Sequence, residues 1–364
     1  MDLIYSPEQE QIRDAARGTL ERHVTHEARL AAEKTESGYD PELWSQMAEL
    51  GWLTSASEDS AFEMLAILAE QMGRTAVATP FPQVASAIML LSAAELSPQG
   101  AELSAKLAAG ETVTVPGPAK VTARDEGGLR LSAGRQLVLW ANTAPGFLVQ
   151  AKTPAGATGL FHVRRDAPGV TISPVRLVDN VKGAWVTFDG VAPEFTAAES
   201  VSEAELAKWN EKVLLLGAAE ATACAHAAVD LTVEYVKERV QFGRAIGSFQ
   251  AVQHGLADSR AFVEAAWLAV WEGVSSIALG EPRPSAGALA AWLAERAIQD
   301  AAVAGSQYHG GMGVTLEYPM HYYYRRAAAT HARLGTQYDL LGKIADTYVD
   351  RAGLGAYSAF LPAR

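Results

Sequence analysis

Two segments of the sequence bring cations, amides and glycines together in a way that suits an anionic ligand. The first, residues 235–254, runs YVKERVQFGRAIGSFQAVQH, so a charged helix end leads through Phe242 and Gly243 into a second helix. Ser248 is placed to cap that second helix through its hydroxyl. An ordinary joint between two helices, with its charges in solvent, is the alternative interpretation.

The second segment, residues 307–327, runs QYHGGMGVTLEYPMHYYYRRA. Gly310 and Gly311 leave backbone N–H groups accessible and let another chain or a phosphate come close. Gln307 and the arginine pair near the end of the segment supply donors for anionic oxygens. On spacing alone, a simple turn between helices explains this segment almost as well.

One carboxylate and one thiol lie in apolar, helical surroundings. Glu220 is embedded in LLLGAAEATA, a dry context that suits a general base. The alternative is a buried carboxylate paired with an arginine or a backbone group. Cys224 is the single cysteine, so disulfide frameworks and multi-cysteine metal sites are excluded, and we expect a packed thiol and no metal.

Helices are predicted on both sides of a β-rich middle. Residues 1–112 form a helical domain in which Ser6 caps the first helix, while Pro41 and Gly51 begin and end a later one. Residues 113–200 alternate and contain many turn signals, which indicates an antiparallel β-domain. Residues 201–364 return to long, alanine-rich helices typical of a four-helix bundle. The predicted fold class is therefore α+β, mostly α.

Composition excludes several classes of function. The 364 residues carry a formal net charge of −12, which argues against a nucleic-acid surface. No uninterrupted apolar run reaches the roughly 20 residues of a membrane span. The beginning of the chain has acidic residues and no apolar signal core, so we expect a cytoplasmic protein.

The two segments taken together resemble the acyl-CoA dehydrogenase family. Their patterns are Arg-x-x-Phe-Gly-x-x-Ile-Gly-x-Phe-Gln-x-x-x-His and, about sixty residues later, Gln-x-His-Gly-Gly-x-Gly-x-Thr. The family's order of helical domain, β-domain and four-helix bundle is the order predicted above. The resemblance implies FAD-dependent α,β-dehydrogenation of an acyl-CoA thioester, with an electron-transfer flavoprotein as the usual electron acceptor.

The resemblance also implies roles for individual residues. In the family, the pyrophosphate and adenine end of one subunit's FAD are held by the neighbouring subunit. Arg239 matches the arginine that reaches the pyrophosphate, and Phe242 and Gln250 match residues around the adenosine. A donor glutamine and two close-approach glycines are matched by Gln307, Gly310 and Gly311.

The sequence departs from the family at the catalytic base. The commonest branch has a glutamate before a Gly-Thr pair, and Leu334 stands there in HARLGTQ. A second branch places its base where this chain has Val213, two helical turns before Glu220. The middle domain also lacks the family's usual flavin-covering segment, and LVLWANTAP resembles its flavin-side segment only loosely.

This pattern resembles the smaller subunits of heteromeric α2β2 acyl-CoA dehydrogenases of bacterial steroid catabolism. A second acyl-CoA dehydrogenase-like subunit then supplies most of the catalytic apparatus. Two alternatives stay open at this point. One is a self-sufficient homo-oligomeric enzyme that uses Glu220 as its base, and the other is a non-catalytic scaffold of the same fold.

Overall fold

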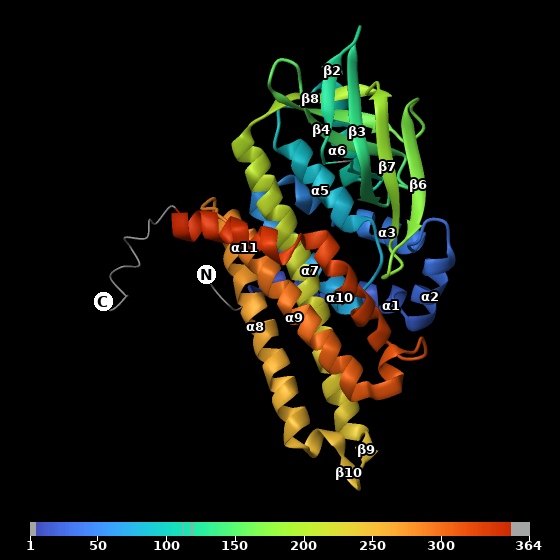
Figure 1. Cartoon of the computed structure of the whole chain (residues 1–364), viewed down its shortest axis with the longest axis vertical. Helices are drawn as coiled ribbons and strands as arrows, with labels where there is room; N and C mark the ends of the chain where they lie inside the picture. The colour runs from blue at the N-terminus through green and yellow to red at the C-terminus, as the bar shows by residue number, and fades with distance from the viewer. Residues whose placement is uncertain (1–4, 112, 118, 351–364) are drawn as a thin grey trace, which may run out of the picture. The chain divides into compact units, whose positions relative to one another are not determined.

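The structure is a computed structural model that describes residues 5–111, 113–117 and 119–350. The chain divides into two compact units (Figure 1). Among the described residues, the bundle unit consists of residues 5–13, 69–76 and 211–350. The sheet unit is drawn from Asp14–Leu68 and Val77–Asn210.

In the described part of the chain, six helices come first: α1 (Pro7–His23), α2 (His26–Lys34), α3 (Pro41–Glu49), α4 (Phe62–Thr75), α5 (Phe81–Ser92) and α6 (Pro98–Ala108). Two short turns, η1 (Thr54–Ser57) and η2 (Asp59–Ala61), precede α4. The ends of these helices follow local chemistry. The Ser6 hydroxyl accepts the Gln9 N–H at 3.2 Å, and Gly51 follows α3 with φ +70°, so both predicted helix signals are confirmed.

The strands of the sheet unit are β1 (Thr114–Pro116), β2 (Thr122–Asp125), β3 (Leu129–Leu139), β4 (Gly146–Lys152), β5 (Thr158–Arg164), β6 (Val170–Arg176), β7 (Lys182–Val191) and β8 (Phe195–Val201). They lie in the order β6-β7-β3-β2-β4-β5-β8, with β1 beside β4. The predicted antiparallel sheet is correct for most neighbours, but β4 pairs in parallel with both β1 and β2.

The core of this sheet includes Trp140, the tryptophan of the LVLWANTAP segment. Trp140 is 1% exposed and adopts φ +63°, while its backbone N–H donates to the Lys182 carbonyl at 2.8 Å. It packs in the same cluster as Phe147 and Phe188, whose ring centroids are 6.0 Å apart. Since its ring is buried here, Trp140 holds the sheet together and offers no surface to a ligand.

The bundle unit is built from long helices: α7 (Glu203–Glu238) from Glu211 onward, α8 (Gln250–Ala278), α9 (Ala286–His309), α10 (Met320–Leu334) and α11 (Gln337–Ala345). A small hairpin, β9 (Val240–Gln241) and β10 (Arg244–Ala245), joins α7 to α8 through the turn η3 (Ile246–Ser248) at one end of the helices (Figure 1). Two further turns are η4 (Gly310–Val314), which links α9 to α10, and η5 (Asp346–Asp350).

Small residues let these helices approach closely. A Cβ on Gly273 would collide with the Leu215 side chain, and one on Gly305 would collide with Met320. Cys224 is fully buried on α7, which confirms the packed thiol. Close approach of this kind explains the alanine- and glycine-rich composition of the C-terminal helices.

The predicted order of helices, strands and helices is confirmed. Helix α6 ends at Ala108 before β1 begins at Thr114, and β8 ends at Val201 before α7 begins at Glu203. The division into three domains stays a prediction, because the compact units join the sheet to most of the first helices.

By length and composition alone, α7 and α8 are apolar enough to cross a membrane. In α7, 72% of the most apolar window is buried inside the structure, and in α8 the share is 50%. Core helices of soluble proteins pass the same test, so this observation is weak evidence for a membrane span.

Candidate functional site

The two segments singled out in the sequence meet at one end of the bundle. The Tyr235 hydroxyl, one turn before Arg239, donates to the His309 carbonyl at 3.4 Å. The Tyr308 hydroxyl donates to the Ala251 carbonyl, also at 3.4 Å. These contacts bring the end of α9 against the ends of α7 and α8, so the two motifs form one surface.

The β9–β10 hairpin presents an aromatic side chain to solvent. Phe242 and Gly243 form its turn with φ +55° and +80°, a conformation that is uncommon for a residue with a large side chain. Phe242 is 92% exposed, and its ring stands edge-on to Phe249 with centroids 6.1 Å apart. An exposed aromatic ring in a strained turn indicates a contact surface for another molecule.

The predicted helix cap at Ser248 is wrong. Its hydroxyl donates to the Ala245 carbonyl at 2.7 Å within η3, and α8 begins two residues later at Gln250. The turn is held instead by backbone bonds, because the Ile246 N–H donates to the Arg239 carbonyl at 2.8 Å. Arg239 and Gln250 thus flank a closed turn, and both are exposed.

The glycine turn η4 leaves open space beside it. Gly310 has φ +58°, and a Cβ placed on Gly310 or Gly311 would meet nothing within 4 Å. Gly313 is different, because its Cβ would lie 3.0 Å from that of His309. Gln307 is exposed in the last turn of α9. The first two glycines therefore offer an accessible backbone, while the third packs the turn onto the helix.

An aromatic cluster that the sequence did not reveal supports this turn. The His309 ring stacks on Tyr235 with centroids 4.2 Å apart and lies 4.8 Å from Tyr318. Its Nδ1 donates to the Gly305 carbonyl at 2.8 Å, and burial lowers the pKa of the imidazole, so it is neutral. Its Nε2 is buried and has no hydrogen-bond partner in the described part of the chain.

This end of the bundle fits a dinucleotide that approaches from outside the chain. Arg239 supplies a charged fork of donors, and Gln250 and Gln307 supply amides. Gly310 and Gly311 allow a phosphate or ribose to come close to the backbone. All six residues predicted from the motifs therefore lie at one exposed surface.

The position of the family's usual base holds a packed leucine. Leu334 is 6% exposed at the end of α10. A Cβ on Gly217 would lie 2.5 Å from its Cδ2 atom, so the leucine fits against the bare backbone of α7. Neither residue can accept a proton, so neither can act as the base.

Glu220 lies one turn beyond Gly217 and is engaged in an ion pair. Its Oε1 receives a hydrogen bond from Arg326 Nη1, and Arg333 Nη1 lies 4.0 Å away. The side chains of Glu220 and Arg326 are only 14% and 7% exposed. Glu220 lies on α7, 19 residues before Arg239, which directly follows the end of that helix at Glu238. The separation is about 28 Å along the helix axis, so Glu220 is not part of the exposed surface.

Val213, at the position where the second branch of the family has its base, lies near another carboxylate that already accepts a hydrogen bond. Val213 itself is half-buried, and Glu211 accepts the Gly287 N–H at 2.6 Å. Gly287 is in the first turn of α9, so the Glu211 carboxylate caps a neighbouring helix. Burial raises the pKa of Glu211, and the bond from Gly287 opposes that shift.

The sequence matches two domain families in the same order as the fold. Residues 6–111 match the acyl-CoA dehydrogenase N-terminal domain, and residues 215–348 match the acyl-CoA dehydrogenase C-terminal domain. The chain is 30% identical to acyl-CoA dehydrogenase IpdE2 of Mycolicibacterium smegmatis over 351 residues, 93% of this chain and 98% of the relative. It is 29% identical to acyl-CoA dehydrogenase FadE27 of Mycobacterium tuberculosis over 337 residues, 85% and 89% of the two chains.

A solved structure shares the fold over nearly the whole chain. A variant of the Tcur3481–Tcur3483 steroid ACAD superimposes with a TM-score of 0.85 at 28% sequence identity. The match covers 95% of this chain and 98% of that one.

Proposed function

The chain belongs to the acyl-CoA dehydrogenase family of FAD-dependent oxidoreductases, and we propose that it is the flavin-contacting subunit of a heteromeric acyl-CoA dehydrogenase. The family predicted from the two motifs is thereby confirmed. The proposed reaction is α,β-dehydrogenation of an acyl-CoA thioester. FAD, when bound, supplies the acceptor for the hydride that leaves the β-carbon.

One observation carries the proposal: Leu334, packed on Gly217, stands where the family's usual branch has its base. Removal of the α-proton needs a carboxylate within hydrogen-bond reach of the substrate. The nearby Glu220 is instead engaged with Arg326 in a buried ion pair. We therefore place the base on a partner subunit and assign Glu220 a structural role.

The exposed end of the bundle is the part that this chain contributes. Arg239 holds the pyrophosphate, since a guanidinium forms two parallel bonds with phosphate oxygens. Phe242 and Gln250 contact the adenosine end. The amide of Gln307 and the open backbone at Gly310 and Gly311 complete the contact.

The relatives suggest the partner and the substrate class. The similar solved structure is the two-component Tcur3481–Tcur3483 steroid ACAD. This supports a second acyl-CoA dehydrogenase-like chain as the partner and a bulky, ring-containing acyl-CoA as the substrate. An electron-transfer flavoprotein is the proposed electron acceptor, and the cytoplasm is the proposed location.

Flavin content and assembly test the proposal. The chain is expressed alone and together with acyl-CoA dehydrogenase-like chains encoded beside it, and visible spectra and solution mass are recorded. We expect a colourless chain alone and a yellow heterotetramer with one partner. A yellow homo-oligomer that oxidises an acyl-CoA would favour a self-sufficient enzyme, and a complex that never binds flavin would favour a scaffold.

A further inference from the structure

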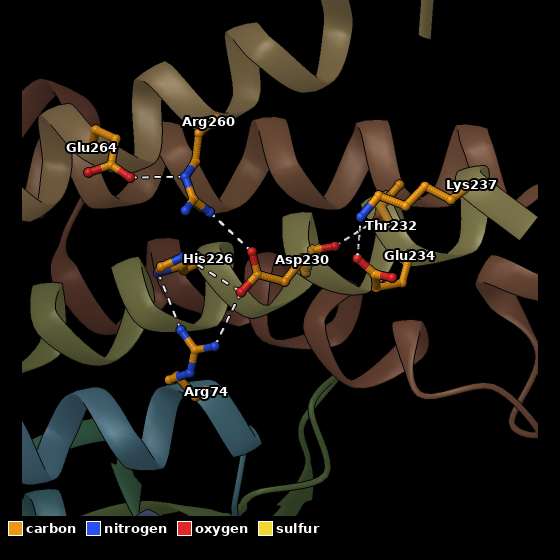
Figure 2. Close-up of polar contacts among 9 residues, drawn as sticks. Arg74, His226, Asp230, Thr232, Glu234, Lys237, Arg260 and Glu264 are labelled. Carbon is orange, nitrogen blue, oxygen red and sulfur yellow. Dashed lines mark hydrogen bonds and ion pairs between the residues drawn. The ribbon is translucent and has the colours of Figure 1, made fainter. Parts of the chain in front are cut away.

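The two helices that carry the flavin-contacting residues are joined part way along their length by one carboxylate. Asp230 lies on α7 nine residues before Arg239, and Arg260 lies on α8 ten residues after Gln250. Asp230 Oδ1 accepts from Arg260 Nη1 at 3.1 Å, as Figure 2 shows. The bond therefore links α7 and α8 at nearly equal distances, about 13–15 Å, from the residues proposed to hold the cofactor.

A third helix is attached to the same carboxylate. Arg74, at the end of α4, donates from Nη2 to Asp230 Oδ2 at 3.2 Å. The Arg74 carbonyl in turn accepts the Tyr323 hydroxyl of α10 at 2.8 Å. Asp230 thus links α4, α7 and α8 through Arg74 and Arg260, and all three of these residues belong to the bundle unit.

His226 lies between Arg74 and Asp230, and its contacts fix its tautomer (Figure 2). Arg74 Nη1 is 3.3 Å from His226 Nδ1. Because a guanidinium can only donate, Nδ1 must be the acceptor, so the proton of the neutral ring is on Nε2. Nε2 lies 3.5 Å from Asp230 Oδ2, which suits an N–H facing a carboxylate.

The charges around His226 act in opposite directions. Asp230 on its own helix favours the protonated ring, as does Glu264 of α8, which is bonded to Arg260 at 2.9 Å. Arg74 of α4 and Arg260 of α8 disfavour it. Burial is the largest influence, and it lowers the pKa of His226, so the ring is neutral near pH 7.

We propose that Asp230 and His226 position the flavin-contacting end of the bundle and that protonation of His226 loosens it. A protonated His226 directs an N–H at the N–H of Arg74 only 3.3 Å away, and this contact must break. Asp230 then turns toward the imidazolium, and its bonds to Arg74 and Arg260 weaken. The position of α7 relative to α8 is then no longer held by this bond, so the spacing between Arg239 and Gln250 can vary.

The first test is the tautomer of His226, read by NMR in the full chain with isotope-labelled histidine and assigned with His226→Gln. We expect the proton on Nε2 at pH 7.5 and titration below the ordinary histidine range. Glutamine keeps an acceptor for Arg74 and a donor for Asp230 without a titrating group. A ring with its proton on Nδ1, or an unshifted titration, overturns the proposal.

The second test follows FAD retention by the yellow assembly from pH 7.5 downward through the titration of His226 that the first test measures. Once His226 is protonated, wild type is expected to bind FAD about tenfold more weakly, the effect of losing one charge-assisted bond. His226→Gln should show no such change, and Asp230→Asn should be weak over the whole pH range. Glu234→Gln is the matched control, because Glu234 lies one turn further along α7 and pairs with Lys237 of the same helix.

The proposal rests on the proposed function for its flavin readout, and the two fail differently. A flat pH profile in wild type, or the same pH dependence in His226→Gln, overturns the positioning role. Unchanged flavin content in Arg239→Ala overturns the assignment of the flavin site instead. If no assembly takes up FAD, the proposed function is wrong, and the tautomer of His226 still decides whether this network is proton-sensitive.

Discussion

The variant Glu220→Gln separates a structural carboxylate from a catalytic one. The substitution keeps the shape of the side chain but removes the negative charge that faces Arg326. If Glu220 is structural, the variant should lose stability and keep its turnover. If it is the base, the variant should keep most of its stability and lose turnover.

The expected loss follows from the burial of the pair. The two side chains are 14% and 7% exposed, and removing one partner of such a pair costs about 3–5 kcal/mol. Glutamine retains an acceptor oxygen, and Arg326 Nη2 keeps its bond to the Ala76 carbonyl at 3.3 Å. We therefore expect a loss of about 3 kcal/mol, or a decrease in Tm of roughly 4 °C for a chain of 364 residues.

Thermal melting and acyl-CoA oxidation by the yellow assembly measure the two effects. Glu272→Gln is the control, because Glu272 pairs with Arg283 at an exposed position where such pairs contribute less than about 1 kcal/mol. The double variant Glu220→Leu with Arg326→Met should regain much of the lost stability, since an apolar pair replaces two buried charges. A hundredfold loss of turnover in Glu220→Gln with an unchanged Tm would refute the structural role.

Three further substitutions test other parts of the structure. Arg239→Ala should weaken FAD retention by about 2–3 kcal/mol, measured by flavin released on dilution, whereas Ala at the exposed Arg124 of the sheet should not. Gly146→Ala should destabilise the chain by about 1–3 kcal/mol in denaturant unfolding, because the added Cβ would collide with the His162 ring. Gly134→Ala is its control, because a Cβ there meets open space and should change stability by less than about 0.5 kcal/mol. Burial raises the pKa of Glu70 above its ordinary value of about 4.5. As the pH rises above that value, Glu70 loses its proton in the unfolded chain before it does so in the folded chain, so wild type should lose stability toward neutral pH. Glu70→Gln should lack that loss in urea midpoints taken from pH 4.5 to 7, and a parallel profile in both proteins would contradict it.

Local signals predicted the elements well, because they act over a few residues. The capping hydroxyl of Ser6 and the left-handed Gly51 mark helix ends by chemistry that the neighbouring sequence contains. Ser248 shows the limit of this reasoning. A serine hydroxyl can bond to several neighbouring backbone groups, and here it donates to the Ala245 carbonyl within the turn instead of capping the helix that follows.

Partners that are distant in sequence could not be predicted. The motifs located Gln307 and the glycines, but His309 stacks on Tyr235 only because α9 ends against α7, 74 residues away in the chain. Pairing with an arginine was the alternative interpretation of Glu220, yet the choice of Arg326, 106 residues away, depends on where α10 packs. The contact between Arg74 and His226 spans 152 residues and left no signal in the sequence.

The proposed division of chemistry between two chains is consistent with the different demands of the two tasks. Holding a dinucleotide across an interface needs exposed donors and an open backbone, which Arg239 and Gly310 still provide. Removing a proton needs a carboxylate free of ion pairs beside the substrate, and Glu220 is engaged with Arg326. Leu334 is 6% exposed and packs on Gly217, so a glutamate placed there would have to bury its charge. The single variant Leu334→Glu should therefore leave the lone chain inactive. Measurable acyl-CoA oxidation by that variant without a partner would show that this chain lacks only the base and has the rest of an active site.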